Sequence, residues 1–448
     1  MPSGKDLSFT QSPALPKNSR GPERVILIAV CFDTRERLQV LENLVELESL
    51  TATAGGLVMD RWVQERSRPE ASCYIGRGKA RELAARVRDL EAQLVIFDDD
   101  LTPGQVRELE RLLGARVIDR SGLIIDIFAD HARTKEARTQ VELAQLQYLL
   151  PRLARRWGHL AGQQGGVIGM RGVGEKQIEL DRRMLRRKIV HLKKDLSRIE
   201  TGRRQRRGAR NGLPRVAVVG YTNAGKSRLV NALADADCKV EDRLFSTLDP
   251  RVRAASLGAH SRVLLVDTVG FLRKLPHHLI ASFRSTLEEV SEADLFLHVV
   301  DASHPACEDH LRVTRQTTTR LGGVERPEIL VFNKADQVDS DGHLQRLRAL
   351  YPEAEIISAQ CGWGLEGLRD RLRNSLWEMH PERHMTLPVS RPDLVHKVYE
   401  SVLVTRQCYR RNRVRLDYRA TEVQQGRLRQ ALVRRGARPR GEHAWLAS

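Results

Sequence analysis

The 448-residue chain has few cysteines and no long hydrophobic run. Its six cysteines lie far apart and form no C-x-x-C pair, which argues against a zinc site or a disulfide framework and fits a reducing cytosol. The longest apolar stretch, residues 25–32, is far too short to span a bilayer. The first twenty residues are polar and lack the apolar core of a signal peptide. We therefore expect a soluble, cytoplasmic protein with at most a peripheral association with membranes.

Acidic residues are also in deficit. The chain has 57 Asp and Glu against 75 Lys and Arg, a net charge of +18. Such a balance suggests a polyanionic partner, although an Arg-rich composition with solvated surfaces would produce the same number. A length of 448 residues predicts three or more domain-sized units.

A glycine-rich segment between an apolar strand and a helix predicts a phosphate-binding loop. Residues 220–227 read G-Y-T-N-A-G-K-S, the G-x-x-x-x-G-K-S pattern. In this pattern the backbone N–H groups face the α- and β-phosphates, Lys226 reaches the β and γ oxygens, and the Ser227 hydroxyl binds Mg²⁺. Alone, the loop predicts only that the chain holds a phosphate chain.

Three further segments, in order, predict that the nucleotide carries guanine. Residues 267–270, D-T-V-G, follow an apolar strand-like run; there Asp267 reaches Mg²⁺ through water and the Gly270 N–H meets the γ-phosphate. In residues 333–336, N-K-A-D, the Asp336 carboxylate can accept from both N1–H and the exocyclic amine of guanine, a donor pair that adenine lacks. Residues 358–360, S-A-Q, complete the set, and the order of four segments makes chance a negligible explanation. The predicted nucleotide-binding residues of these segments are Gly220, Tyr221, Thr222, Asn223, Ala224, Gly225, Lys226, Ser227, Asp267, Thr268, Val269, Gly270, Asn333, Lys334, Ala335, Asp336, Ser358, Ala359 and Gln360.

Residues 22–135 predict a small N-terminal α/β domain, after a disordered tail at 1–21. Apolar strand-like runs alternate there with helical patterns. The strands are expected at 25–31, 94–97 and 115–118, and the helices at 36–49, 79–90 and 102–113. The segment G-R-G-K at 76–79 lacks phosphate-loop spacing, so we expect a turn that caps a helix beginning at Lys79. Three aspartates at 98–100 precede Thr102 and Pro103, which favours an acidic helix entrance over a metal site.

Two runs with helical leucine spacing predict an antiparallel helical hairpin at 136–210. The apolar positions, which step by three and four residues, are Leu143, Leu146, Leu150 and Leu153, and then Leu185, Ile189, Leu192, Leu196 and Ile199. Between them, residues 157–174 are rich in glycine and contain no acidic residue. A flexible linker is one interpretation, but Trp157, Ile168 and Met170 among the glycines favour a loop that contacts a partner.

The end of this hairpin is strongly basic. Residues 182–210 carry thirteen Lys and Arg against two acidic residues. This excess is too one-sided for salt bridges along the helix and favours contacts with a phosphate backbone. The candidate RNA-contacting residues of the loop and the basic run are Gly165, Gly166, Met170, Arg171, Arg203, Arg204, Arg206 and Arg207.

The remaining chain predicts a nucleotide-binding domain at 211–380 and a small α+β domain at 381–448. In the latter we expect helices at 394–404 and 421–434 and a strand at 414–418. The predicted fold class is α/β and multidomain, with an N-terminal α/β domain, an antiparallel helical hairpin, a Ras-like P-loop GTPase domain and a small α+β C-terminal domain.

With these pieces in order, the chain closely resembles the HflX family, in the Obg–HflX branch of translation-associated GTPases. The stretches that carry the resemblance include residues 117–128 (V-I-D-R-S-G-L-I-I-D-I-F), 245–250 (F-S-T-L-D-P) and 267–273 (D-T-V-G-F-L-R). The last of these, together with L-P-H at 275–277, is highly specific. The resemblance implies that Thr247 senses the γ-phosphate and Mg²⁺. It extends the nucleotide-binding set to Phe245, Ser246, Thr247, Leu248 and Asp249. The chain departs from the family pattern at three positions. Val173 stands where Pro is usual, Lys176 where Thr or Ser is usual, and Arg228 where Thr is usual.

The resemblance also implies an activity and partners. It implies hydrolysis of GTP to GDP and phosphate with Mg²⁺, binding of a monomer to the large (50S) ribosomal subunit, and separation of stalled or idle 70S ribosomes. The loop of the hairpin would point at the peptidyl transferase region. Three other roles stay open: assembly of the large subunit, rescue of ribosomes under stress, and RNA-binding regulation with a nucleotide switch. A second nucleotide site, for ATP, in residues 22–135 also stays open.

Two residues bear on the rate of hydrolysis. Phe271 stands where many GTPases have a glutamine that orients the attacking water, which predicts slow turnover until a partner completes the site. Asn223 makes K⁺ a candidate second cofactor, because related GTPases often coordinate K⁺ with an asparagine at this place. The paired histidines at 277–278 are expected to pack or face solvent rather than bind a metal. A signalling GTPase would need lipidation or a membrane segment, and a tRNA-modifying one a cysteine near its end; neither is present.

Overall fold

The structure of the protein is a computed structural model. It describes residues 22–153, 171–208, 213–235, 245, 251–258, 261–274, 292–320, 326–338, 340–420, 422–435, 437–440 and 444–447. The chain divides into two compact units. The first contains residues 1–201 with 242–249 and 274–284, and the second contains 202–241, 250–273 and 285–448. The tail expected at 1–21 lies outside the described residues.

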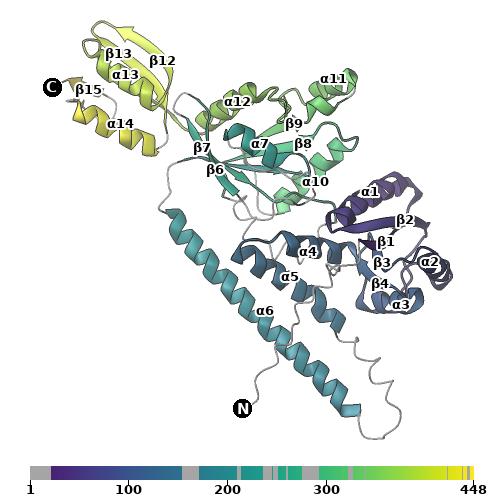
Figure 1. The fold of residues 1–448 in the computed structure, drawn as a ribbon. Coiled ribbons are helices and arrows are strands. Elements are labelled where there is room, and N and C mark those ends of the chain that lie inside the picture. Colours follow the sequence, from purple (N-terminus) through teal and green to yellow (C-terminus); the bar gives the residue numbers. More distant parts are fainter. Residues whose placement is uncertain are drawn as a thin grey trace, which may run out of the picture. The chain divides into compact units, whose positions relative to one another are not determined.

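The first unit is built on a four-stranded parallel sheet in the order β2-β1-β3-β4 (Figure 1). Its strands are β1 (Glu23–Cys31), β2 (Gly56–Glu65), β3 (Leu94–Phe97) and β4 (Arg116–Asp119). The 3₁₀ helix η1 (Thr34–Glu36) and the helices α1 (Arg37–Thr53), α2 (Arg77–Asp89), α3 (Pro103–Leu113) and α4 (Arg120–His131) connect or follow them. The last seven residues of β1 are all buried, as expected for a parallel strand covered on both faces.

Three strands and three helices of this sheet agree with the sequence prediction, while β2 and α4 were not predicted. Helix α4 has nine consecutive buried residues, so it offers no alternation of polar and apolar positions that could reveal a helix. Helix α2 begins at Arg77, two residues before the expected start, and Gly76 caps it with a φ of 84°. Thr102 caps α3 through a capping box with Gln105, which confirms the helix entrance.

The aspartates before α3 take part in structural ion pairs. Asp98 accepts from Arg120 Nη1 at 2.7 Å and from Lys274 Nζ at 2.6 Å, within the first unit. Arg120, fully buried, also pairs with Glu46. Burial tends to raise the pKa of Asp98, but these two cations hold it below its usual value. Two of the three aspartates, Asp98 and Asp99, are therefore paired with cationic side chains of the chain itself, and Asp100 accepts from the Ser121 hydroxyl.

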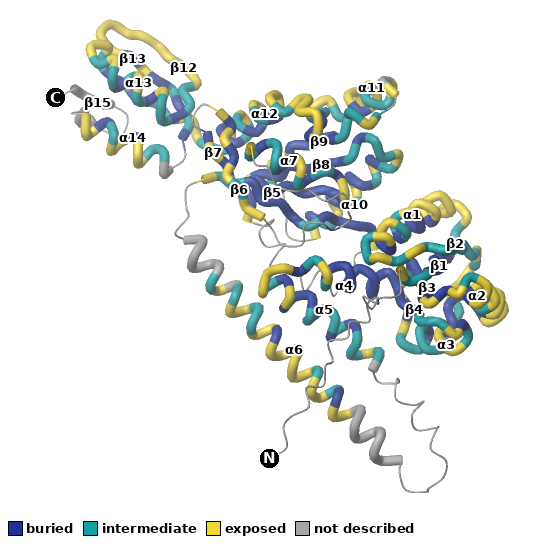
Figure 2. Tube along the Cα trace, in the orientation of Figure 1, coloured by how far each residue is buried: buried dark blue, intermediate teal, exposed yellow. Residues whose placement is uncertain are grey.

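The predicted helical hairpin is present as α5 (Lys135–Leu153) and α6 (Arg171–Gly208) (Figure 1). Its apolar cluster contains Leu143, Leu146, Ile189 and Leu192, with Leu150, Leu185 and Leu196 packed against it. Figure 2 shows buried and exposed residues alternating along α6, as expected for a helix with one apolar face. With 38 residues at about 1.5 Å each, α6 is about 57 Å long.

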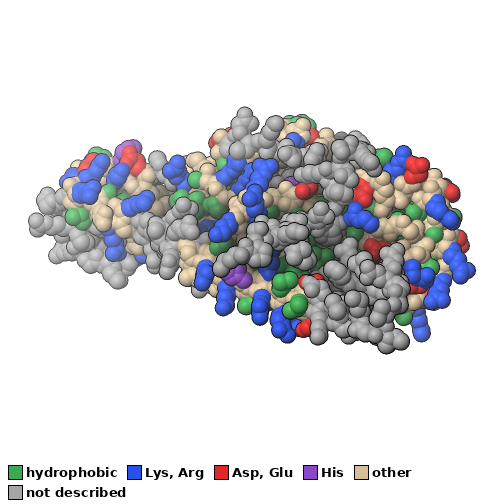
Figure 3. Space-filling view, turned by 60° about the horizontal axis from the view of Figure 1, so that its bottom comes forward, with side chains coloured by type: hydrophobic (Ala, Val, Ile, Leu, Met, Phe, Trp, Pro, Cys, Tyr) green, Lys and Arg blue, Asp and Glu red, His purple; other side chains and the backbone are tan. Residues whose placement is uncertain are grey.

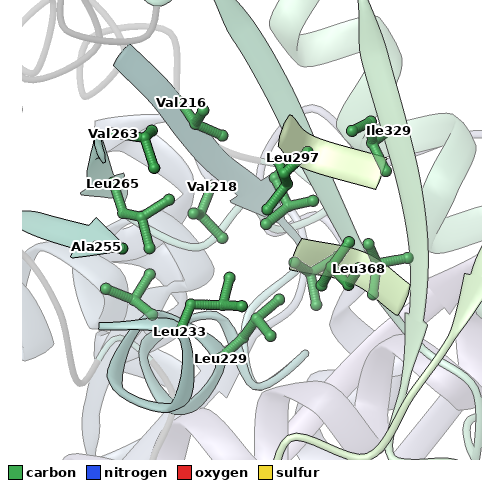
Figure 4. Close-up of a cluster of buried hydrophobic side chains, with 14 of the residues drawn as sticks. Val216, Val218, Leu229, Leu233, Ala255, Val263, Leu265, Leu297, Ile329 and Leu368 are labelled. Carbon is green, nitrogen blue, oxygen red and sulfur yellow. The ribbon is translucent and has the colours of Figure 1, made fainter. Parts of the chain in front are cut away.

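The second unit contains a six-stranded sheet in the order β10-β9-β8-β5-β7-β6, parallel except for the pair β6–β7. The strands are β5 (Arg215–Gly220), β6 (Arg251–Ser256), β7 (Arg262–Asp267), β8 (Leu295–Asp301), β9 (Glu328–Asn333) and β10 (Glu355–Ile356). The helices are α7 (Lys226–Leu233), α10 (Cys307–Arg320), η3 (Ala335–Gln337), α11 (Asp341–Leu350) and α12 (Leu365–Glu378). Figure 4 shows the core, where Val216 and Val218 of β5 meet Leu229 and Leu233 of α7. This core fixes the loop between β5 and α7.

The C-terminal part of the second unit is a five-stranded sheet in the order β12-β13-β11-β15-β14. Its elements are β11 (Glu382–Pro388), α13 (Pro392–Ser401), β12 (Leu403–Arg410), β13 (Arg413–Arg419), α14 (Glu422–Arg434), β14 (Ala437–Arg440) and β15 (Ala444–Ala447). The expected strand and second helix are confirmed. The helix expected to reach residue 404 ends at Ser401 instead, because the β-branched run that follows pairs with β13 as strand β12.

Candidate nucleotide-binding site

The loop between β5 and α7 is held so closely by its neighbours that two positions admit only glycine. A Cβ on Gly220 would lie 2.2 Å from the carbonyl oxygen of Val299. A Cβ on Gly225 would lie 2.3 Å from Asn333 Nδ2, and Gly225 also caps α7 with a φ of 86°. The helix N-terminus of α7 therefore opens into a tight backbone turn, the arrangement that binds phosphate groups.

Lys226 lies buried at the start of α7. Its Nζ donates to the carbonyl oxygens of Gly220 at 3.2 Å and Tyr221 at 2.7 Å. Burial lowers the pKa of Lys226 to about 8, and the nearby charge of Asp267 only partly opposes this shift. The ammonium group thus lies within the turn that the phosphates would enter.

Ser227 and Asp267 lie together as expected for a Mg²⁺ site in which the serine binds the ion directly and the aspartate binds it through water. Ser227 Oγ donates to Asp267 Oδ2 at 2.7 Å, and Asp267 is buried at the end of β7. A hydroxyl and a carboxylate at this distance fit the preference of Mg²⁺ for hard oxygen ligands completed by water and phosphate. The described residues contain no cluster of three or more His, Cys, Asp or Glu that could bind a metal by itself.

The segment after β7 packs directly onto the phosphate loop. Thr222 N–H donates to the Phe271 carbonyl at 2.9 Å, and Phe271 N–H donates to the Gly220 carbonyl at 3.1 Å. A Cβ on Gly270 would lie 2.7 Å from Thr222 Cγ2, so glycine is required there too. The Phe271 ring is buried, which places a packing residue, without a polar group, next to the γ-phosphate glycine.

The base site is assembled around Asn333. Its Nδ2 donates to the Ala224 carbonyl at 2.9 Å and its Oδ1 accepts from Ala359 N–H at 3.0 Å, so one side chain joins three of the four predicted segments. Asp336 Oδ1 is shielded from solvent and has no hydrogen-bond partner within the described part of the chain. A buried carboxylate oxygen without a donor is costly. The N1–H and amine of a guanine would satisfy it, so the residues fit that base.

Sequence reasoning did not foresee several contacts that support this site. Lys334, whose backbone φ is 63°, forms an ion pair with Asp301 at 2.7 Å. Asp301 stands at the end of the apolar strand β8, and this position could have identified it from the sequence. Arg228 Nη1 donates to Gln360 Oε1 at 2.7 Å across 132 residues. No local pattern could have predicted that pair, which lets Arg228 orient the loop at 358–360.

Aromatic packing supports the other end of the loop. The ring of Tyr221 stacks on His310 with centroids 3.8 Å apart, and its hydroxyl accepts from Arg273 N–H at 3.0 Å. Burial, and next the neighbouring His304, lower the pKa of His310 to about 3, so this imidazole is neutral. The stacked pair fixes the loop without adding charge to it.

Several predicted residues cannot be compared with the structure. Ser246, Thr247, Leu248 and Asp249, and also Gly165, Gly166 and Met170, lie outside the described residues. Arg171, Arg203, Arg204, Arg206 and Arg207 lie on α6, but their side chains are outside the described part. Phe245 is buried in the first unit, where its ring lies edge-on to Phe128 with centroids 4.6 Å apart.

No helix in the described ranges has the length and apolar character needed to cross a membrane.

Three family models match the chain. Residues 41–129 match "GTP-binding GTPase N-terminal", residues 131–210 match "GTP-binding GTPase Middle Region", and residues 215–334 match "50S ribosome-binding GTPase".

Curated relatives named GTPase HflX match most of the chain. The protein of Caldanaerobacter subterraneus subsp. tengcongensis is 47% identical, covering 80% of this chain and 82% of its own. The Escherichia coli protein is 41% identical, covering 84% and 88%. A solved GTP-binding protein from Sulfolobus solfataricus in complex with GDP is 24% identical and covers 79% and 98%, with a TM-score of 0.42. On the family models and the curated relatives, which agree with the geometry of the site, the chain binds and hydrolyses GTP and belongs to the HflX family of GTPases.

Proposed function

We propose that this GTPase acts as a monomer on the large ribosomal subunit and uses GTP to separate stalled or idle 70S ribosomes into subunits. The observation that carries the proposal is the α5–α6 hairpin, whose two long helices pack through a continuous apolar cluster. The hairpin is a stiff stem, and the glycine-rich segment that joins its helices supplies no nucleotide-binding motif. Such a stem can carry that segment into a partner while the nucleotide domain binds GTP.

The charge of the stem supports a ribonucleic acid partner. On α6, Arg183, Arg186 and Arg187 are exposed. Lys193, Lys194 and Arg198, with Val190 and Ser197, line a shallow depression of about 450 Å³. Asp195 pairs with His191 and Arg198 and neutralises only part of this charge. Exposed cations along a helix are suited to successive phosphates, and their contribution to affinity falls as salt rises.

The site implies how hydrolysis would be controlled. Mg²⁺ would be held by Ser227, with Asp267 acting through water, and would neutralise charge on the β- and γ-phosphates. Lys226 and the backbone N–H groups of the loop would orient the phosphate chain. Phe271 offers no group to position the attacking water, so the free protein would turn over slowly and the bound subunit would supply or organise the missing group.

Splitting can be measured by light scattering of 70S ribosomes, which falls as particles separate. We expect the full-length protein with GTP to lower the signal and GDP to be ineffective. In the same mixtures, added large subunits should raise the rate of GTP hydrolysis. Binding to large subunits without any loss of 70S signal would favour an assembly role instead.

A loop deletion separates the roles of the two parts. A variant lacking residues 162–172 should bind GTP like the wild type, since the four nucleotide motifs lie beyond residue 219. It should no longer split ribosomes. If it split 70S particles at the wild-type rate, the loop would be only a connector and the proposed role of the hairpin would be wrong.

A further inference from the structure

Among the described residues, helices α13 and α14 cover only one face of the C-terminal sheet. Alternate residues of its strands, among them Met385 and Leu387 of β11 and Leu416 of β13, are buried against Leu394 of α13 and Leu428 of α14. Side chains alternate between the faces of a strand, so the residues between them form a second, open face. This face lies outside the three segments matched by family models, which end at residue 334.

The open face is lined by arginines. In the register of β12 with β13, Arg410 lies opposite Arg413, Cys408 opposite Arg415, and Arg406 opposite Asp417. In these three pairs four arginines face one carboxylate, Asp417, which pairs with Arg415 Nε at 2.9 Å. On the next strand, Glu382 lies on the same face opposite Arg419, so positive charge stays in excess. The side chains of Arg406, Arg410 and Arg413 are exposed, and their guanidinium groups have no hydrogen-bond or ion-pair partner among the residues described.

Edge protection alone does not account for this pattern. Charged residues on an outer strand prevent pairing with other chains, and β12 is an edge strand. However, β13 lies inside the sheet and still carries Arg413 and Arg415 on the same face. The arginines thus form a patch that spans two strands, about 5 Å apart, rather than a single charged edge. In Figure 3, Lys and Arg side chains are also visible on the C-terminal elements at its left.

Exposed aromatic rings lie next to the arginines, on the other side of the same strand edge. Tyr409 alternates with Cys408 and Arg410, and its register partner Val414 is buried on the face that the helices cover. Tyr409 is 65% exposed and Tyr399 of α13 is 45% exposed. Gln407 links them: its Oε1 accepts from the Tyr399 hydroxyl at 2.7 Å, and its Nε2 donates to the Tyr409 hydroxyl. A strand edge with arginines on one face and fixed, exposed tyrosines on the other suits RNA that passes over this edge, because phosphates pair with guanidinium groups and unpaired bases stack on aromatic rings.

We propose that this open face of the C-terminal sheet, with Arg406, Arg410 and Arg413 at its centre, binds ribosomal RNA of the large subunit. The proposal rests on the proposed function and adds to it a second RNA contact, separate from the hairpin stem. Each arginine would contact one phosphate. Tyr409, on the opposite face of the edge strand β12, would stack on a base that lies beyond this edge.

The test compares two triple variants of the full-length protein. One carries Arg406, Arg410 and Arg413→Gln on the open face. The control carries Arg427, Arg429 and Arg434→Gln, three exposed arginines on α14 of the same domain. Both variants lose three positive charges, so a long-range effect of net charge would change their affinities equally. A third variant with lysine at the three open-face positions keeps the charge.

Affinity is measured for intact large subunits, with a non-hydrolysable GTP analogue, and for deproteinised large-subunit rRNA, between about 50 and 200 mM salt. Three lost phosphate contacts should lower the log–log salt slope by roughly 2 to 3, so that wild-type affinity falls about 20- to 40-fold more than that of the open-face variant over this range. The α14 control and the lysine variant should keep the wild-type slope. Tyr409→Ala should weaken rRNA binding by about 5- to 160-fold without changing the slope.

The outcomes separate the two proposals. GTP binding by every variant, expected to be unchanged, reports that the chain is folded. If the wild type binds subunits and the open-face variant shows the same log–log salt slope as the wild type, the RNA surface is refuted and the proposed function stands. If the variant is weakened on subunits but not on deproteinised rRNA, the face binds a ribosomal protein and the assignment to RNA is wrong. If wild type binds neither probe, the proposed function fails, and the RNA surface fails with it.

Discussion

Replacing Asp336 with Asn should change which nucleotide the protein prefers. Asp336 Oδ1 is buried without a hydrogen-bond donor in the described structure, and the base would supply two donors to this carboxylate. Hydrogen bonds to a charged group contribute about 1.5–3 kcal/mol each. Losing both therefore weakens GTP binding by about 3–6 kcal/mol, or roughly 10²- to 10⁴-fold in Kd. The amide can instead donate to the extra carbonyl of xanthine, so xanthosine triphosphate should bind the variant better than it binds the wild type.

The assay is competition of GTP, ATP and xanthosine triphosphate against a fluorescent guanine nucleotide. Glu366→Gln is a matched control, because it removes one negative charge from an exposed position at the start of α12 in the same domain. The control should keep wild-type affinities. Equal GTP affinity in the wild type and the Asp336→Asn variant would refute the assignment of the base site.

Three other predictions follow from the site and the stem. Burial lowers the pKa of Lys226 to about 8, although the charge of Asp267 opposes this shift. Lys226 is therefore fully charged well below pH 8 and loses its proton above pH 8, so GTP affinity should fall as the pH rises through this value. Calorimetry at about pH 8.5, in buffers of different ionisation enthalpy, should detect proton uptake on binding, and its absence would contradict this reasoning. Exchanging K⁺ for Na⁺ should slow GTP hydrolysis in the wild type but not in Asn223→Ala; equal wild-type rates in both salts would remove the K⁺ site. Leu192→Ala should destabilise the α5–α6 stem by about 2 kcal/mol or more, seen as faster hydrogen exchange in both helices, whereas Val190→Ala, at a residue 54% exposed on the same helix, should not.

The nucleotide site was largely predictable from sequence because its parts are short, local patterns. Gly220, Gly225 and Gly270 are required by close backbone approaches, which is why the spacing of glycines identifies such loops. The stem was predictable for a similar reason, since Leu143 and Leu192 belong to regular helical repeats.

Long-range and fully buried features were not predictable in this way. The contact of Arg228 with Gln360 joins residues 132 positions apart, and neither residue belongs to a pattern that indicates the other. Helix α4 is buried on all sides, so it has no polar face to reveal its period. The arginines of the C-terminal sheet form one patch only once β12 and β13 pair in register, whereas in sequence they are simply part of a basic segment.

The central claim is that this protein binds the large ribosomal subunit in its GTP-bound state. Sedimentation of the full-length protein with purified large subunits in GTP, a non-hydrolysable GTP analogue or GDP tests it most directly. We predict that the protein sediments with the subunits in the analogue, less in GTP, and weakly or not at all in GDP. Equal sedimentation in all three nucleotides, or none in any, would contradict the account.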